Sequence, residues 1–152
     1  MMNDKIYKLI IFTVASLFIV SCKKVEDKFP PGCYQFDADM EEIGGEEEKF
    51  STTFNVLLLE SDESYLKIKF FVGDTLWDEP DLLTITNGKN VQGSFPARLN
   101  GDKPIIVESG TIIKKNRNEY IIEGSLKYEV LFDAGWDVYW RKCEGTYTFH
   151  PK

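Results

Sequence analysis

The side chains that could perform acid–base or nucleophilic chemistry are few in this sequence. The chain has a single histidine, His150, so a Ser-His-Asp arrangement would have to use it. One histidine does not support a His-based zinc site, and neither Gly-x-Gly-x-x-Gly nor a phosphate-binding loop is present. A pair of carboxylates for glycoside hydrolysis is defined by its separation in the folded chain, so we assign no such pair from the sequence. We therefore expect no enzymatic activity, no metal and no cofactor.

Carboxylates cluster between positions 37 and 48. Oxygen ligands of this kind could bind calcium, although their spacing matches no EF-hand loop. A solvated loop between the first two strands is the alternative, and we favour it because charge runs are usually solvated. The members of this acidic stretch are Asp37, Asp39, Glu41, Glu42, Glu46, Glu47 and Glu48.

Tryptophans mark two further candidate sites. Trp77 lies between Gly73 and Pro80, in an expected loop where it could stack on a sugar ring while Asp78 binds a hydroxyl. We favour a lid residue that caps one end of the fold, because Trp is highly buried on average. Trp136 and Trp140 could either line a cavity or fill it.

The N-terminus carries the pattern of a secretory signal peptide. Lys5 and Lys8 precede an apolar run from Leu9 to Val20, which is shorter than the about 20 apolar residues of a membrane-spanning helix. A basic start, a short apolar segment and a small residue at its end are typical of a cleaved export signal.

The end of this segment indicates a more specific destination. Ile19-Val20-Ser21-Cys22 resembles the lipobox of bacterial lipoproteins. The resemblance implies acylation of Cys22 and anchoring by several acyl chains without a transmembrane span. Lys23 replaces the Asp that favours inner-membrane retention in enterobacterial lipoproteins, which points to the outer membrane. We expect a signal peptide over residues 1–21, a lipidated Cys22 and tether over 22–31, and a folded domain over 32–152.

Two cysteines remain once Cys22 is assigned to the lipid. The compartment of an exported protein is oxidising, so Cys33 and Cys143 are expected to form a disulfide that joins the start of the domain to its end. Closing so long a loop would contribute roughly 4–5 kcal/mol in the chain-entropy model. Two free buried thiols are the alternative.

Charge excludes one class of partner. The chain has 25 Asp and Glu against 18 Lys and Arg, a net charge of −7, and loss of the signal peptide makes it more acidic. Nucleic acids are not expected as partners, because their phosphates require Lys and Arg. By the same reasoning, anionic lipid headgroups are expected to repel the domain, so that the acyl chains alone hold it on the membrane.

Alternating apolar and polar residues predict β-strands. Leu66, Ile68 and Phe70 share one face with lysines opposite, and residues 120–132 alternate in the same way. This period of two is typical of half-buried antiparallel strands, and no window carries an apolar stripe of helical period. The eight expected strands span roughly residues 33–38, 50–60, 64–72, 81–86, 89–96, 105–115, 119–132 and 136–149.

Short links between consecutive strands favour an all-β meander. Eight strands can close into a small barrel, which removes the exposed sheet edges, so the first and last strands are expected to pair. A sandwich of two sheets fits the strand count almost as well.

The last hairpin decides where two tryptophans point. A turn at 133–135 would place Trp136 opposite Phe132 and Trp140 opposite Tyr128, with both tryptophans facing the interior. A bulge near residues 141–142 would then be needed to bring Cys143 back to the inward face.

This pattern resembles the lipocalin-like small barrels found in many short bacterial lipoproteins. The resemblance covers most of residues 32–150 and is architectural, because Tyr34 stands near the place of the Trp in the lipocalin Gly-x-Trp at a different spacing. It implies an apolar ligand inside the barrel, while no binding residue is carried over. The inward aromatics expected to contact the ligand are Tyr34, Phe36, Phe70, Tyr128, Trp136 and Trp140.

Two functions follow from this fold. The preferred one is binding of a small apolar or lipid-like ligand by a lipoprotein of the cell envelope. The alternative is a protein- or glycan-interaction module with a filled core, of the accessory or inhibitor type. Bacterial lysozyme inhibitors share this general design. The inward set is large and aromatic, with Gly124 as the obvious gap.

Overall fold

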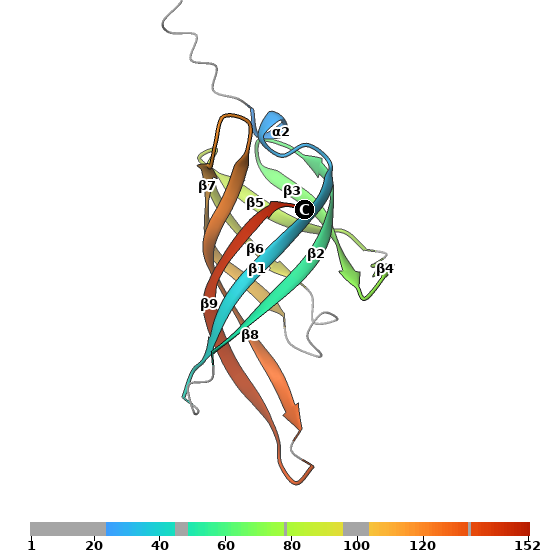
Figure 1. Cartoon of the computed structure of the whole chain (residues 1–152), viewed down its shortest axis with the longest axis vertical. Helices are drawn as coiled ribbons and strands as arrows, with labels where there is room; N and C mark the ends of the chain where they lie inside the picture. Colours follow the sequence, from blue (N-terminus) through green and yellow to red (C-terminus); the bar gives the residue numbers. More distant parts are fainter. Residues whose placement is uncertain (1–23, 45–48, 78, 96–103, 134) are drawn as a thin grey trace, which may run out of the picture.

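The computed structural model describes residues 24–44, 49–77, 79–95, 104–133 and 135–152, and strands make up most of them (Figure 1). One short helix precedes the strands. The elements are α2 (Val25–Lys28), β1 (Gly32–Glu42), β2 (Lys49–Ser61), β3 (Tyr65–Val72), β4 (Thr75–Leu76), β5 (Asp81–Thr86), β6 (Asn90–Phe95), β7 (Ile105–Lys114), β8 (Tyr120–Asp133) and β9 (Val138–Pro151).

The strands form one antiparallel meander that closes on itself. Neighbouring strands pair in chain order, and the circle is completed because β1 pairs with β9 as well as with β2. β3 pairs directly with β5, and β4 is an additional short strand on β3. The eight-stranded meander barrel predicted from the sequence is confirmed. Its single closed sheet excludes the two-sheet sandwich.

Aromatic side chains fill the middle of the barrel. Phe36 on β1 is only 1% exposed. Its ring centroid lies 4.7 Å from that of Phe149, 5.4 Å from Tyr147, 5.7 Å from Phe95 and 6.2 Å from Phe70. Rings at such distances are in contact, so the centre of the barrel is packed with side chains from four of its strands.

The gap expected at Gly124 is covered by Tyr147. Gly110, Gly124 and Tyr147 lie directly opposite one another on β7, β8 and β9. A Cβ atom on Gly110 would lie 2.3 Å from the Tyr147 hydroxyl oxygen, so the phenol ring reaches across β8 to β7. Gly110 therefore makes room for this ring, whereas the absent side chain of Gly124 lets the β7 backbone approach β8 closely. Burial raises the pKa of Tyr147, and its hydroxyl has no hydrogen-bond partner among the described residues.

The α2 segment is docked on one end of the barrel. Val25 is 4% exposed, and Phe29 is completely buried. The Phe29 ring lies 6.1 Å from Phe149 and 6.4 Å from Tyr34, and the Tyr34 hydroxyl donates to the Pro30 carbonyl at 2.9 Å. The expected tether over residues 22–31 thus contributes to the core from Val25 onward. No helix within the described ranges is long and apolar enough to cross a membrane.

The predicted disulfide between Cys33 and Cys143 is wrong. Both cysteines are free, Cys33 exposed and Cys143 buried. Tyr34, next to Cys33, pairs with Pro151, whereas Cys143 pairs with Glu42 at the other end of β1. About nine residues of strand separate the two positions, which is roughly 30 Å, far beyond the Cα distance that a disulfide spans. The sequence expectation failed because β9 runs antiparallel to β1.

Candidate functional site

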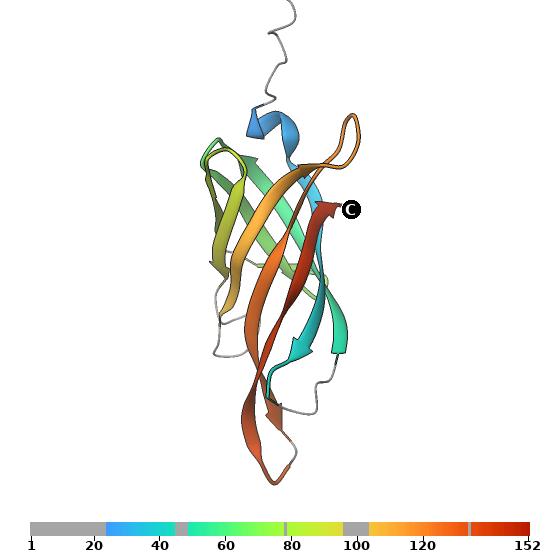
Figure 2. The ribbon, with the colours of Figure 1, turned by 90° about the vertical axis from the view of Figure 1, so that its left-hand side faces the viewer.

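The β8–β9 hairpin extends well beyond the rest of the barrel, at the end opposite α2 (Figure 2). Its outer part exposes large apolar side chains, although such residues usually contribute to a core. Trp136 at the turn is 99% exposed, and Val138 is 59% exposed. We call this set the tip patch; its members are Leu131, Trp136, Val138 and Tyr139.

The inward orientation predicted for Trp136 is therefore wrong. The structure pairs Tyr128 with Cys143, Leu131 with Trp140 and Phe132 with Tyr139, and no bulge interrupts this register. The buried face of β9 continues in one phase from Phe149 to Cys143. Packing of these inward residues fixes the register, and the turn residues then project outside the barrel.

A half-buried ion pair holds the base of the hairpin. Arg141 Nη1 lies 3.2 Å from Glu42 Oε2, and the Ile43 amide donates to the Lys142 carbonyl at 2.8 Å. The Arg141 guanidinium also lies over the Tyr139 ring, with its carbon 5.7 Å from the ring centroid. These contacts connect the end of β1 to β9, so the hairpin leaves the barrel from a fixed base.

An apolar cleft of about 480 Å³ lies beside this base. Burial raises the pKa of Tyr128 to about 12. Burial and the nearby Glu42 carboxylate raise the pKa of the Cys143 thiol, which makes Cys143 a poor nucleophile. The cleft is lined by Ile43, Pro104, Ile106, Lys127, Tyr128, Glu129, Lys142 and Cys143.

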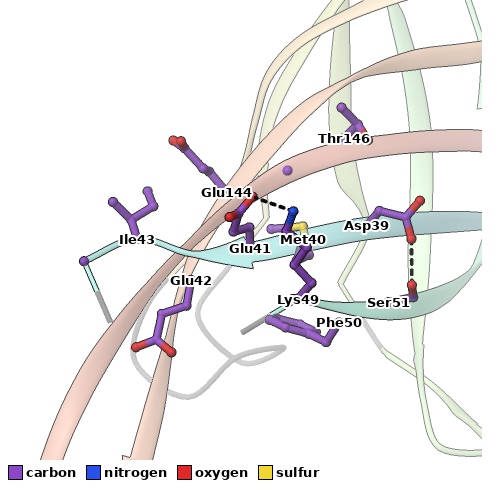
Figure 3. Close-up of a pocket in the computed structure, with 12 residues that line it drawn as sticks. Asp39, Met40, Glu41, Glu42, Ile43, Lys49, Phe50, Ser51, Glu144 and Thr146 are labelled. Carbon is purple, nitrogen blue, oxygen red and sulfur yellow. Dashed lines mark hydrogen bonds and ion pairs between the residues drawn. The ribbon is translucent and has the colours of Figure 1, made fainter. Parts of the chain in front are cut away.

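A second, more polar hollow of about 800 Å³ lies where β1 ends and β2 begins, beside the middle of β9 (Figure 3). Asp39 accepts a hydrogen bond from Ser51 at 2.6 Å, and Glu41 lies 3.9 Å from Lys49. Glu144 on β9 also lines this hollow. Ser51 and Lys49 thus already contact two of the carboxylates that line this hollow, Asp39 and Glu41.

The acidic stretch is only partly the loop that was expected. Residues 37–42 belong to β1, where Asp37 and Asp39 point outward and Glu42 is buried. Glu46, Glu47 and Glu48 lie outside the described residues. Within the described ranges, no group of three His, Cys, Asp or Glu is placed to hold a metal ion.

The single histidine is held between two hydrogen-bond acceptors. His150 Nε2 lies 2.6 Å from Asp37 Oδ2, and Nδ1 lies 2.7 Å from the Pro151 carbonyl oxygen. Thr53 donates to the other Asp37 oxygen at 2.7 Å. The bonds from His150 and Thr53 lower the pKa of Asp37. Both ring nitrogens are engaged, and Thr53 contacts Asp37 rather than the imidazole, so this trio does not have the geometry of a catalytic triad.

We expect Asp37→Asn to lower stability at neutral pH but not in strong acid. A carboxyl whose pKa is lowered by folding stabilises the native state above its unfolded pKa of about 4, and this contribution disappears as the pH falls through the folded pKa. The pair is partly exposed, so we expect at most about 1 kcal/mol.

Thermal unfolding of the variant at pH 7 and pH 2 measures this difference. Asp39→Asn is the matched control, because it removes an exposed carboxylate of the same strand that bonds Ser51 and no histidine. An equal loss for Asp37→Asn at both pH values would contradict the assignment.

The other predicted site residues lie in three separate parts of the molecule. Tyr34, Phe36 and Phe70 are buried in the core, whereas Trp140 is half-buried on the hairpin. Trp77 is half-buried after β4, with its amide bonded to the Phe70 carbonyl at 2.8 Å, and Asp78 lies outside the described residues. The structure does not bring these residues together around one site.

The tip patch was only partly visible in the sequence. Tyr139 lies between Val138 and Trp140 in the sequence, so alternation with the expected inward Trp140 predicts an outward Tyr139, and the structure leaves it 39% exposed. Leu131 and Val138 were not singled out. One signal was available: the last two expected strands were longer than those of residues 81–96, which implies that they extend beyond the barrel.

Comparison with known proteins adds no relative. No family model, no curated protein and no solved structure matches this chain. The site is therefore defined by its own geometry: an acidic, filled barrel with an apolar hairpin tip on a fixed base.

Proposed function

We propose that this protein is a lipid-anchored interaction module of the bacterial cell envelope, in which the tip patch inserts into an apolar pocket of a partner protein. The observation that supports this proposal is the complete exposure of Trp136, at 99%, on a hairpin that projects from the barrel. Trp, Tyr and Arg dominate the energetics of protein interfaces, and all three occur here as Trp136, Tyr139 and Arg141. The anchor is the expected acylated Cys22, with the outer membrane as its location.

The packing of the barrel argues against the preferred expectation of a ligand in its centre. Phe36 and Phe70 occupy that space together with rings from other strands. Catalysis is also disfavoured, because the Cys143 thiol has a raised pKa and His150 is bonded at both nitrogens.

A small apolar ligand remains a second candidate, at a different place. The cleft beside the hairpin base has a volume of about 480 Å³ and is lined by Ile106 and Tyr128, and such a volume is typical of small-molecule sites. Native mass spectrometry of the gently purified protein tests it. An added mass of a few hundred daltons would support this candidate, and a bare mass would contradict it.

We expect a photoreactive benzoyl-phenylalanine at position 138 to crosslink to one protein in intact cells. Val138 is 59% exposed beside Trp136. The same probe at Thr111, an exposed position on β7, is the control and should give no such product. Trp136→Ala should abolish the crosslink while changing the free energy of unfolding by less than about 0.5 kcal/mol, as is usual for exposed residues.

The crosslinked product separates the outcomes. A protein adduct that depends on Trp136 supports the proposal. A glycan or lipid adduct, or equal crosslinking from positions 138 and 111, would contradict it.

A further inference from the structure

Charge is unevenly distributed along the barrel axis. The loops at the α2 end comprise residues 24–31, 62–64, 87–89, 114–119 and 151–152, as the strand directions require. Among them cations outnumber anions, although the whole chain has a net charge of −7. We call the cations of these loops the basic rim; its members are Lys24, Lys28, Lys89, Lys114, Lys115, Arg117 and Lys152. The anions of the same end are Glu26, Asp27, Asp62, Glu63 and Glu119.

Direct contacts hold the segments of the basic rim together. Lys28 Nζ lies 5.5 Å from the centroid of the Tyr120 ring, which connects α2 to the start of β8. The Ile112 amide donates to the Lys89 carbonyl at 2.8 Å, which connects the β5–β6 turn to β7. The rim is thus a fixed feature of this end of the barrel.

Local partners already engage part of the negative charge at this end. Asp62 accepts bonds from the amide and hydroxyl of Ser64 at 3.1 and 3.0 Å. Glu119 accepts from Asn116 at 2.7 Å and lies 3.6 Å from Lys115. Glu119 thus pairs with Lys115, and among the described residues no carboxylate contacts Lys114 or Arg117.

Further carboxylates lie away from the α2 end. Glu41 and Glu42 end β1, where they pair with Lys49 and Arg141, and Asp74, Glu79 and Asp81 surround β4 at the side of the barrel (Figure 1). β9 alone has 14 residues, so tens of ångströms separate the two ends. Salt screens charges beyond about 8–10 Å. An anionic surface near α2 would consequently sense the charges of this end, where cations outnumber anions, and not the net charge of the chain.

The chain that leads to α2 is short. Val25 is buried on the barrel, and Cys22 precedes it by three positions. Three residues span at most about 11 Å. A lipid on Cys22 would therefore hold this end, and not the hairpin, within about 11 Å of the membrane.

We propose that the α2 end lies against the membrane and that its basic rim binds anionic phospholipid headgroups, so that the barrel stands upright with the hairpin pointing away. This inference rests on the lipid anchor of the proposed function. It replaces the expectation from net charge that headgroups repel the domain. Each cation at such a surface strengthens binding about fivefold.

Intrinsic fluorescence offers a direct test, because none of the three tryptophans lies at the α2 end. They are Trp77, Trp136 and Trp140. The full-length protein is expressed, purified as the mature lipoprotein and inserted into vesicles that contain dansyl-labelled lipid headgroups. On vesicles with phosphatidylglycerol we expect weak energy transfer from the native tryptophans. Asn118→Trp places a reporter in the β7–β8 turn and should give strong transfer.

A matched pair of variants tests the rim itself. Lys114→Gln with Arg117→Gln should weaken docking about 25-fold, from fivefold per cation, and transfer from the hairpin tryptophans should rise as the barrel tumbles on its anchor. Lys49→Gln with Lys69→Gln removes the same charge away from the α2 end and should behave as the wild type. High salt, or vesicles of phosphatidylcholine alone, should reproduce the rim variant.

Three results would overturn the inference. These are strong transfer from the native tryptophans on anionic vesicles, identical behaviour of the two double variants, and insensitivity to salt. The intact mass of the purified protein reports acylation of Cys22 separately. An unacylated protein would thus refute the anchor of the proposed function, whereas an acylated but unoriented protein would refute only the upright orientation.

Discussion

Phe36→Ala is expected to lower the free energy of unfolding by about 3–5 kcal/mol, the usual cost of removing a buried phenylalanine ring. Phe36 is 1% exposed and contacts four other aromatic rings from β3, β6 and β9. Those rings come from strands fixed by backbone pairing, so they cannot collapse fully into the space. Since whole domains are stable by about 5–15 kcal/mol, this single change consumes a large fraction of the stability.

Urea unfolding followed by circular dichroism measures the effect. Ile113→Ala is the control, because Ile113 is an apolar strand residue that is 38% exposed, and we expect it to cost about 1 kcal/mol or less. A Phe36→Ala variant as stable as this control would mean that the barrel has a hollow centre. That result would restore the internal ligand as the preferred function.

Gly124→Ala is expected to destabilise the barrel by about 3 kcal/mol, the upper part of the usual range for overpacking. An added Cβ atom would lie 1.9 Å from the Ser109 carbonyl oxygen and 2.7 Å from the Gly110 Cα atom. Both obstacles are backbone of β7, so no rotation of a side chain relieves the clash. β7 and β8 would have to separate where Gly110 pairs with Gly124.

The midpoint of thermal unfolding measures this change, with Glu123→Ala as the control on the exposed face of the same strand. Glu123→Ala should leave the midpoint within a few degrees of the wild type, because exposed substitutions cost about 0.5 kcal/mol or less. An unchanged midpoint for Gly124→Ala would contradict the close approach of the two strands.

Periodicity was sufficient to predict the barrel itself. Alternation in residues 66–72 and 120–132 placed β3 and β8, and short links predicted a meander whose ends meet. Such signals are local, since each depends on which face of one strand is apolar. β1 was predicted too short because its acidic residues resemble a loop. Their period of two, with Ala38, Met40 and Glu42 inward, is that of a strand.

The site depended on information that no local pattern contains. The inward orientation of Trp136 followed from a turn placed at 133–135, whereas the register is set by Tyr128 against Cys143 inside the barrel. The distance between Cys33 and Cys143 likewise depends on how β9 runs relative to β1. The strand register and the distance between the cysteines both depend on residues far apart in the chain, so the local pattern of residue types could not predict them.

The pairing of β1 with β9 also has a consequence for how the chain folds. Asp37 lies opposite Thr148, and Glu42 opposite Cys143, so the seam joins residues more than 100 positions apart. Contacts of such high sequence separation make folding slow, on the scale of milliseconds to seconds. During synthesis β1 emerges first and keeps one open edge until β9 follows. For that interval the nascent chain exposes an unpaired strand, the feature on which edge-to-edge aggregation begins.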